Sequence, residues 1–278
     1  MSEYKEVKVL DKGFVQLIDT MGDDRSICQS ARVSYSGGKL KNKSSDEKLI
    51  RYLMRNSHWS PFEMCQIKLH MKMPIFVARQ FYTYRASSRN EISGRYSKLE
   101  SNFFIPEESR IFGQGVLNKQ GSEKPLEEEI QKQSVELIQK SVNDSAKAYE
   151  ALLESGVSRE ISRVVLPTSI YTEFYWSMNL RNIFNFLSQR LDEHAQIEIR
   201  EYAKVIYEIV KEWVPIALSA FEDYNLNATT FSAQEIEILR SVLQSHIMAE
   251  TFSSAINKEN NLKGSEKVEF LKKINKMV

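Results

Sequence analysis

Basic and aromatic side chains are concentrated in one stretch of the sequence, residues 79–98, which reads RQFYTYRASSRNEISGRYSK. Glu91 is the single acid within it. A solvated helix face mixes the two signs of charge more evenly, so this stretch indicates a surface that binds an anion. Its cations are Arg79, Arg85, Arg89, Arg95 and Lys98.

Two later clusters also contain several arginines. Guanidinium groups and amides that project from one helix surface suit the bidentate capture of phosphate and the edge of a planar base. The clusters therefore predict a nucleotide site. The alternative is that each arginine forms a surface ion pair with neighbouring glutamates. One cluster consists of Arg159, Glu160 and Arg163, and the other of Asn179, Arg181, Asn185, Arg190 and His194.

Other kinds of chemistry find little support in the sequence. Neither G-x-G-x-x-G nor G-x-x-x-x-G-K-[ST] is present, so a glycine-rich loop is not expected to hold phosphate. The serines of residues 79–98 have no nearby histidine in the sequence, and the four histidines lack the spacing of metal ligands. We therefore predict phosphate binding by side chains, no enzyme nucleophile and no metal.

The overall charge excludes a global electrostatic field. The chain has 38 Lys and Arg against 37 Asp and Glu, which leaves nothing to attract nucleic acid or an anionic membrane in general. Cys28 and Cys65 cannot build a disulfide framework, and no apolar run has the length of a signal peptide or a membrane span. These features predict a cytoplasmic protein that binds neither nucleic acid nor membrane.

The hydrophobic periodicity predicts an α+β fold. Residues 66–73 alternate strictly between apolar and polar, as a half-buried strand does, and helical spacing begins after Pro74. Stretch 79–98 then passes into polar, turn-prone residues. Further expectations are strands in residues 7–10 and 14–19, a long loop over 100–125, an amphipathic helix ending at Gly156, a helical segment closed by Pro167, helical periodicity from 171 to 218, and a charged tail after 257.

Several motifs in one order resemble the flavin-dependent thymidylate synthases. The signature of that family is Arg-His-Arg, seven residues and then Ser, which aligns with residues 83–93. The similarity covers about residues 5 to 225. It extends through NEISGRYS, HWSPFE, SREISRVVLP, NLRNIFNFLSQRLDEHAQIEI and LDKGFVQLIDTMGDD.

The signature itself differs at two positions. Where the family has Arg-His-Arg, this chain has Thr83-Tyr84-Arg85. The loss of a guanidinium at position 83 removes a charge-assisted hydrogen bond of roughly 1.5–3 kcal/mol. Tyr84 is the milder change, because a phenol can still pack against a flavin and donate one hydrogen bond.

The resemblance implies an enzyme and its assembly. It implies one α+β domain over residues 1–225, with a mostly antiparallel sheet flanked by long helices, and a helical, charged C-terminal extension over residues 226–278. It implies a homotetramer with active sites between subunits. It also implies reductive C5 methylation of dUMP to dTMP, with methylenetetrahydrofolate as carbon donor and NADPH as reductant through FAD.

The resemblance also implies roles for individual residues. Ser93 and Arg95 would donate to the phosphate of dUMP. Arg190 would be the catalytic residue, lying at the pyrimidine edge and stabilising negative charge there. The residues that match dUMP contacts are Gln80, Glu91, Ser93, Gly94, Arg95, Arg163 and Arg190. Those that match FAD contacts are Ser60, Thr83, Tyr84, Arg85, Ala86, Glu91, Asn179, Arg181 and Asn185.

Two alternatives remain open at this point. The first is C5 alkylation of a related pyrimidine nucleotide, such as UMP or a modified dUMP. The second is a nucleotide-binding paralogue without catalysis, which the altered signature motivates.

Overall fold

The computed structural model describes residues 6–33, 43–116, 121–243, 266 and 268–270. The chain divides into two compact units, Met1–Leu226 and Asn227–Val278. The first is an α+β unit that contains every candidate site residue named above. The second contains helix α9 (Ala233–Leu243). Most of the charged tail expected after residue 257 lies outside the described residues.

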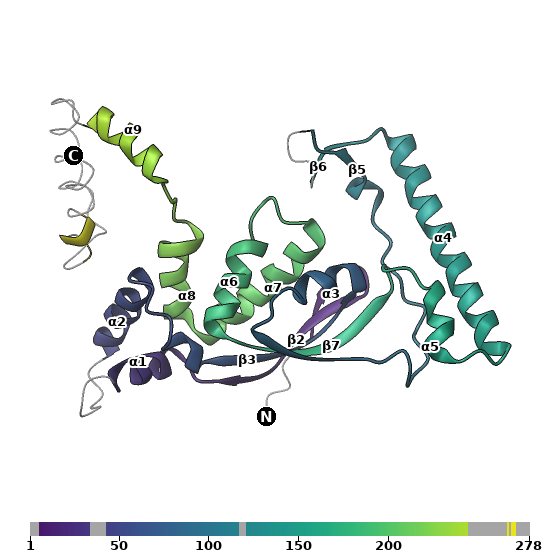
Figure 1. Ribbon diagram of the computed structural model, residues 1–278, viewed down its shortest axis with the longest axis horizontal. Helices are drawn as coiled ribbons and strands as arrows, with labels where there is room; N and C mark the ends of the chain where they lie inside the picture. The colour runs from purple at the N-terminus through teal and green to yellow at the C-terminus, as the bar shows by residue number, and fades with distance from the viewer. Residues whose placement is uncertain (1–5, 34–42, 117–120, 244–265, 267, 271–278) are drawn as a thin grey trace. The chain divides into compact units, whose positions relative to one another are not determined.

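A five-stranded sheet organises the first unit (Figure 1). Its strand order is β1-β2-β3-β7-β4, and every neighbouring pair is antiparallel. The predicted α+β class with a mostly antiparallel sheet is confirmed. The strands are β1 (Val7–Val9), β2 (Gly13–Met21), β3 (Gln66–Pro74), β4 (Ser87–Glu91) and β7 (Tyr171–Asn179).

The alternating pattern of β3 decides which face of the sheet is buried. Ile67, Leu69 and Met71 are buried, whereas the lysine and the histidine between them lie on the opposite face. Leu69 pairs in register with Trp176 of β7, which is also buried. Helices α3, α6 and α7 lie over this side of the sheet and close the core (Figure 1).

Two sequence expectations are wrong here. Residues 171–179 were expected to continue a helical pattern but form β7, which pairs with both β3 and β4. Their burial alternates, and the helical spacing starts only at Leu180. Residues 87–91 were expected to be polar and turn-like but form the edge strand β4. An edge strand obtains its hydrogen bonds from one neighbour, so it needs no apolar pattern of its own.

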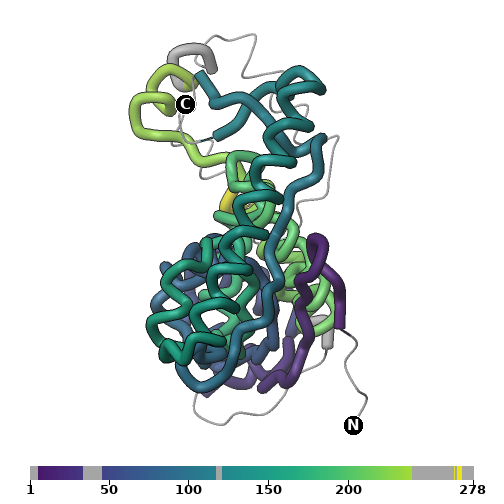
Figure 2. The backbone as a smooth tube through the Cα atoms, turned by 90° about the vertical axis from the view of Figure 1, so that its right-hand side faces the viewer, coloured from purple at the N-terminus to yellow at the C-terminus, as the bar shows by residue number. Residues whose placement is uncertain are grey.

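Residues 100–125 run along the long helix α4 (Glu128–Glu154) and are not a plain loop (Figure 2). Phe103 packs with Val142 of α4 and with Ile170 in a small second core. The backbone N–H of Leu99 donates to the hydroxyl of Tyr149 at 3.1 Å. The segment contains the short helix η2 (Glu108–Arg110) and the antiparallel pair β5 (Phe112–Gln114) and β6 (Ser122–Pro125).

The remaining helices surround the sheet and its connections. These helices are α1 (Asp24–Arg32), α2 (Lys43–Arg55), η1 (Phe62–Met64), α3 (Ile75–Phe81), α5 (Arg159–Ser162), η3 (Arg163–Val165), α6 (Leu180–Arg190), α7 (Ile197–Trp213), α8 (Pro215–Phe221) and the π-helical turn η4 (Glu222–Leu226). Across the described ranges, no helix is long and apolar enough to cross a membrane.

Candidate functional site

The tight turn that follows β4 carries the first group of predicted site residues. The backbone N–H of Tyr96 donates to the carbonyl of Ser93 at 3.1 Å, which closes the turn. A Cβ built on Gly94 would lie 3.0 Å from Leu99 Cδ1 and 3.3 Å from Arg163 Cδ. A hydrogen at position 94 therefore leaves room for the Arg163 side chain to lie against the turn. The turn at Gly94 and the Arg163 side chain, which are far apart in the sequence, therefore meet at this point.

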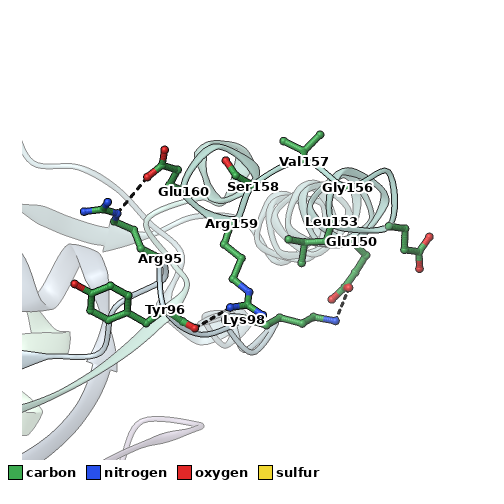
Figure 3. Close-up of a pocket in the computed structure, with 11 residues that line it drawn as sticks. Arg95, Tyr96, Lys98, Glu150, Leu153, Gly156, Val157, Ser158, Arg159 and Glu160 are labelled. Atoms are coloured by element: carbon green, nitrogen blue, oxygen red, sulfur yellow. Dashed lines mark hydrogen bonds and ion pairs between the residues drawn. The ribbon is translucent and has the colours of Figure 1, made fainter.

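A cleft of about 720 Å³ opens beside this turn, between residues 95–98 and the ends of α4 and α5 (Figure 3). Arg95 Nε lies 3.2 Å from a carboxylate oxygen of Glu160, and both side chains are more than half exposed. Arg159 donates to the carbonyl of Tyr96 at 2.8 Å. Arg95 therefore forms a surface ion pair in this structure, as the alternative interpretation of the arginine clusters predicts. Because exposed pairs contribute only about 0–1 kcal/mol, a phosphate can displace Glu160 at small cost.

A second group lies where α3 and α6 end. Arg190 Nε donates to the hydroxyl of Tyr84 at 2.8 Å, and that hydroxyl donates to Gln189 Oε1 at 2.8 Å. Gln80 donates to Gln196 Oε1 at 2.7 Å, which ties α3 to the residue before α7. The Tyr84 side chain is buried, and burial raises the pKa of its phenol above the ordinary value. The phenol is therefore neutral at neutral pH.

A third group lines a groove of about 680 Å³ around the start of α6. Asn179 caps this helix, because its side-chain oxygen accepts a hydrogen bond from the Asn182 N–H at 3.0 Å. The Arg181 guanidinium pairs with Glu63 of η1 at 2.5 Å. Aromatic side chains of Trp59 and Phe184 complete the walls. Of the predicted cofactor residues, the groove contains Ala86, Asn179, Arg181 and Asn185.

Other predicted residues lie outside these groups. Ser60 stands just before η1, where its carbonyl accepts a hydrogen bond from the Glu63 N–H at 3.2 Å. Thr83 donates to the carbonyl of Gln80 at 2.7 Å and is exposed, as is Arg85. Glu91 accepts a hydrogen bond from Thr172 at 2.5 Å. The groove that contains four predicted cofactor residues is not lined by the other five, which are Ser60, Thr83, Tyr84, Arg85 and Glu91.

The first and second groups do not meet within one chain. Among the described residues, no hydrogen bond or ion pair joins Arg190 to Ser93, Arg95 or Arg163. Their elements also differ, since α6 lies over the sheet and α5 lies beside α4 (Figure 1). The family resemblance implies that these residues bind one nucleotide in a site between subunits, and that assignment stays a prediction.

Sequence reasoning missed several residues that hold the predicted ones. Gln189 and Gln196 orient Tyr84 and Gln80, and nothing in their local pattern distinguishes them from surface glutamines. The contact between Asn179 and Asn182 could have been predicted. An asparagine just before a helical pattern is a typical N-cap, and its side chain accepts a hydrogen bond from the backbone N–H three residues later. Within the described part of the chain, no group of three His, Cys, Asp or Glu residues is arranged to hold a metal ion.

The fold and these clefts define a class, namely an α+β protein with an antiparallel sheet and with clefts lined by arginine and amide side chains. Residues 16–216 match the model of the family described as thymidylate synthase complementing protein. A flavin-dependent thymidylate synthase from Thermus thermophilus is 49% identical over 268 residues, which is 96% of this chain and 95% of the relative. One from Anaplasma marginale is 48% identical over 241 residues, or 87% and 82% of the two chains.

A solved structure has the same fold. The crystal structure of a UMP/dUMP methylase, PolB from Streptomyces cacaoi, bound with 5-Br dUMP, superposes with a TM-score of 0.72 at 29% identity. The match covers 79% of this chain and 99% of PolB. The chain belongs to the flavin-dependent thymidylate synthase family, and the resemblance seen in its sequence is confirmed.

Proposed function

We propose that this protein is a flavin-dependent thymidylate synthase that methylates dUMP at C5 to give dTMP. The observation that carries the proposal is similarity to such an enzyme over nearly the whole length, 49% identity over 96% of the chain. The enzyme is a flavoprotein with FAD as its cofactor. Methylenetetrahydrofolate as carbon donor and NADPH as reductant belong to the same proposal.

The Ser93–Arg95 turn would bind the phosphate of dUMP. Ser93 offers a hydroxyl, Arg95 and Arg163 offer guanidinium groups, and Gly94 allows the close approach of Arg163. Glu91 follows at the end of β4 and would accept hydrogen bonds from the sugar. Phosphate binding here exchanges the exposed Glu160 partner of Arg95 for a ligand with greater negative charge.

Arg190 would act at the pyrimidine ring. Its guanidinium would donate to the carbonyl edge of the base and stabilise negative charge there as the ring reacts at C5. A single well-placed donor of this kind contributes roughly 3 kcal/mol to the transition state. Gln80 would hold the other part of the base edge from the end of α3. No enzyme nucleophile is required, in keeping with the sequence.

The groove around the start of α6 fits part of FAD. Four asparagine residues and a half-exposed guanidinium line it beside aromatic side chains, a donor set that suits phosphate or ribose oxygens and a planar ring. The positive end of α6 favours negative charge at the same place. Asn179, Arg181 and Asn185 would hold the cofactor, which supplies a hydride to the one-carbon unit when bound and reduced.

We further propose a homotetramer in which a second copy completes each site. The separation of the Ser93 and Arg190 groups within one chain supports this. So do exposed apolar side chains on α4, α5 and η3: Leu137 is 69% exposed, Ile161 57% and Val164 74%. Two unpaired, buried cysteines are compatible with a reducing compartment, and we propose the cytoplasm.

UMP is a second candidate substrate. PolB, the structural neighbour, carries the description UMP/dUMP methylase, and Thr83-Tyr84 differs from the family signature. A substitution in the nucleotide-binding site can change how strongly an enzyme discriminates between a ribose and a deoxyribose.

An anaerobic assay tests the proposal. Purified protein is supplied with FAD, NADPH and methylenetetrahydrofolate, and either dUMP or UMP is added while flavin oxidation and methylated nucleotide are measured. The expected result is dTMP from dUMP, with flavin oxidation that depends on both nucleotide and folate. Methylation of UMP at the higher kcat/KM would assign the second candidate. Flavin oxidation without any methylated product would contradict both.

A further inference from the structure

Tyr84 connects the signature stretch to the arginine proposed to bind the pyrimidine. The phenol accepts a hydrogen bond from Arg190 Nε at 2.8 Å and donates one to Gln189 at 2.8 Å. Only 8% of Tyr84 is exposed, and its ring packs edge-on against Phe186 with centroids 5.1 Å apart. The phenol therefore has a donor and an acceptor engaged inside the protein, and packing fixes its ring.

These contacts restrain Arg190 from one side only. Besides the hydrogen bond at Nε, the Arg190 Cζ atom lies 5.5 Å from the centroid of the Tyr84 ring. Within the described residues, no other hydrogen bond or ion pair holds this guanidinium. Its terminal amino groups are left to bind a ligand, and the two contacts reduce the conformational freedom that ligand binding would otherwise have to remove.

We propose that Tyr84 is a positioning residue for Arg190 that strengthens the binding of dUMP, and not a contact for flavin. The inference rests on the proposed function, in which Arg190 binds the pyrimidine. It differs from the role that the family resemblance implies for position 84, where the aligned residue is a histidine that contacts the cofactor. The substrate class that the arrangement selects is a planar ring whose carbonyl edge becomes negative.

The neutrality of the phenol matters for this role. Burial raises the pKa of Tyr84, so its hydroxyl accepts from the guanidinium without carrying negative charge. A carboxylate in the same place would neutralise Arg190 and compete with an electron-rich base edge. Tyr84 thus orients the guanidinium while leaving its full charge available to the ligand.

The test compares Tyr84→Phe with Tyr202→Phe in the full-length protein. Tyr202 is a suitable control because it is also buried and donates one hydrogen bond of 2.8 Å, to the carbonyl of Lys72. Calorimetry measures dUMP affinity and flavin fluorescence measures FAD affinity. We expect Tyr84→Phe to raise the Kd for dUMP about tenfold and to change the Kd for FAD less than about twofold. Tyr202→Phe should change neither.

A double-mutant cycle separates positioning from a general structural effect. In the Arg190→Lys background the planar fork is gone, so Tyr84→Phe should weaken dUMP binding by less than about twofold. Gln189→Leu changes an exposed residue and removes the acceptor that orients the phenol. It should raise the Kd for dUMP about threefold. This variant keeps the proposal testable if Tyr84→Phe folds poorly.

Each contrary outcome identifies what has failed. If Tyr84→Phe weakens FAD binding as much as dUMP binding, or if its penalty persists beside Arg190→Lys, then Tyr84 does not act through Arg190. If the wild-type protein binds dUMP but forms no dTMP, the proposed reaction fails, while the binding measurements still decide the role of Tyr84. If it binds no dUMP, both proposals are overturned.

Discussion

Arg190 and Arg95 are both expected to bind dUMP, but they occupy different environments. Arg190 is held at Nε by a neutral, buried phenol at 2.8 Å. Arg95 lies 3.2 Å from the exposed carboxylate of Glu160 at the rim of a wide cleft. A neutral partner orients a cation without reducing its charge, whereas an exposed acid is easily displaced but competes with the ligand. The first arrangement suits orientation at the reacting ring, and the second suits capture of phosphate.

Removal of Arg190 should have the largest effect on the reaction. We expect Arg190→Ala to lower kcat about 10²- to 10³-fold, because a donor aimed at developing charge is lost. Single-turnover formation of dTMP measures the effect, and thermal unfolding of the same sample checks that the protein remains folded. A kcat within about tenfold of wild type would show that Arg190 does not stabilise the transition state.

A second expected loss, of stability, concerns a buried ion pair at the start of α7. Arg110 Nε lies 2.8 Å from Glu198 Oε1, and the Glu198 side chain is only 4% exposed. Glu198→Gln should lower the free energy of unfolding by about 3 kcal/mol, since Arg110 loses its counter-charge. Urea denaturation measures this. Glu201→Gln, which breaks the exposed pair with Lys204, is the control and should cost less than about 0.5 kcal/mol. Equal losses in the two variants would contradict the prediction.

Crowding at the phosphate turn should weaken substrate binding moderately. Gly94→Ala places a methyl group 3.3 Å from Arg163 Cδ and 3.0 Å from Leu99 Cδ1, which forces both side chains to shift. A shift costing about 1 kcal/mol raises the KM for dUMP about fivefold. Gly113→Ala is a matched control, because its methyl group would lie 3.3 Å from Leu126 in the β5-β6 pair. Steady-state kinetics measure the KM for dUMP of both variants. An equal rise in the two KM values would contradict the prediction.

The smallest expected effect distinguishes the two arginines most clearly. Glu160→Gln removes the exposed acid beside Arg95, so the KM for dUMP should fall about twofold at low salt. The gain should disappear at high ionic strength, because exposed charges are screened. The Tyr84→Phe penalty should depend much less on salt, since the phenol is neutral and buried. Kinetics over a salt series would contradict the comparison if both variants responded equally.

Local sequence patterns predicted elements in which one whole face is buried. The alternation in residues 66–73 predicted β3, because one face of that strand is wholly buried. Strand β4 could not be predicted in this way, since its five residues are nearly all exposed and it exists only through pairing with β7. Strand β7 was missed because the helical spacing that follows it obscured its own alternation. Pairing partners distant in the sequence decided both strands.

By itself, the sequence determined the family, the α+β class and which residues carry cationic and amide groups. Residue type and motif order settle those points, because they depend on chemistry and not on position. Only the tertiary structure decided that Gly94 and Arg163 meet, that Arg190 forms no bond with them, and that Tyr84 faces Arg190. Such contacts join residues about 70 to 106 positions apart. The packing of helices on the sheet sets these distances, and no local pattern encodes them.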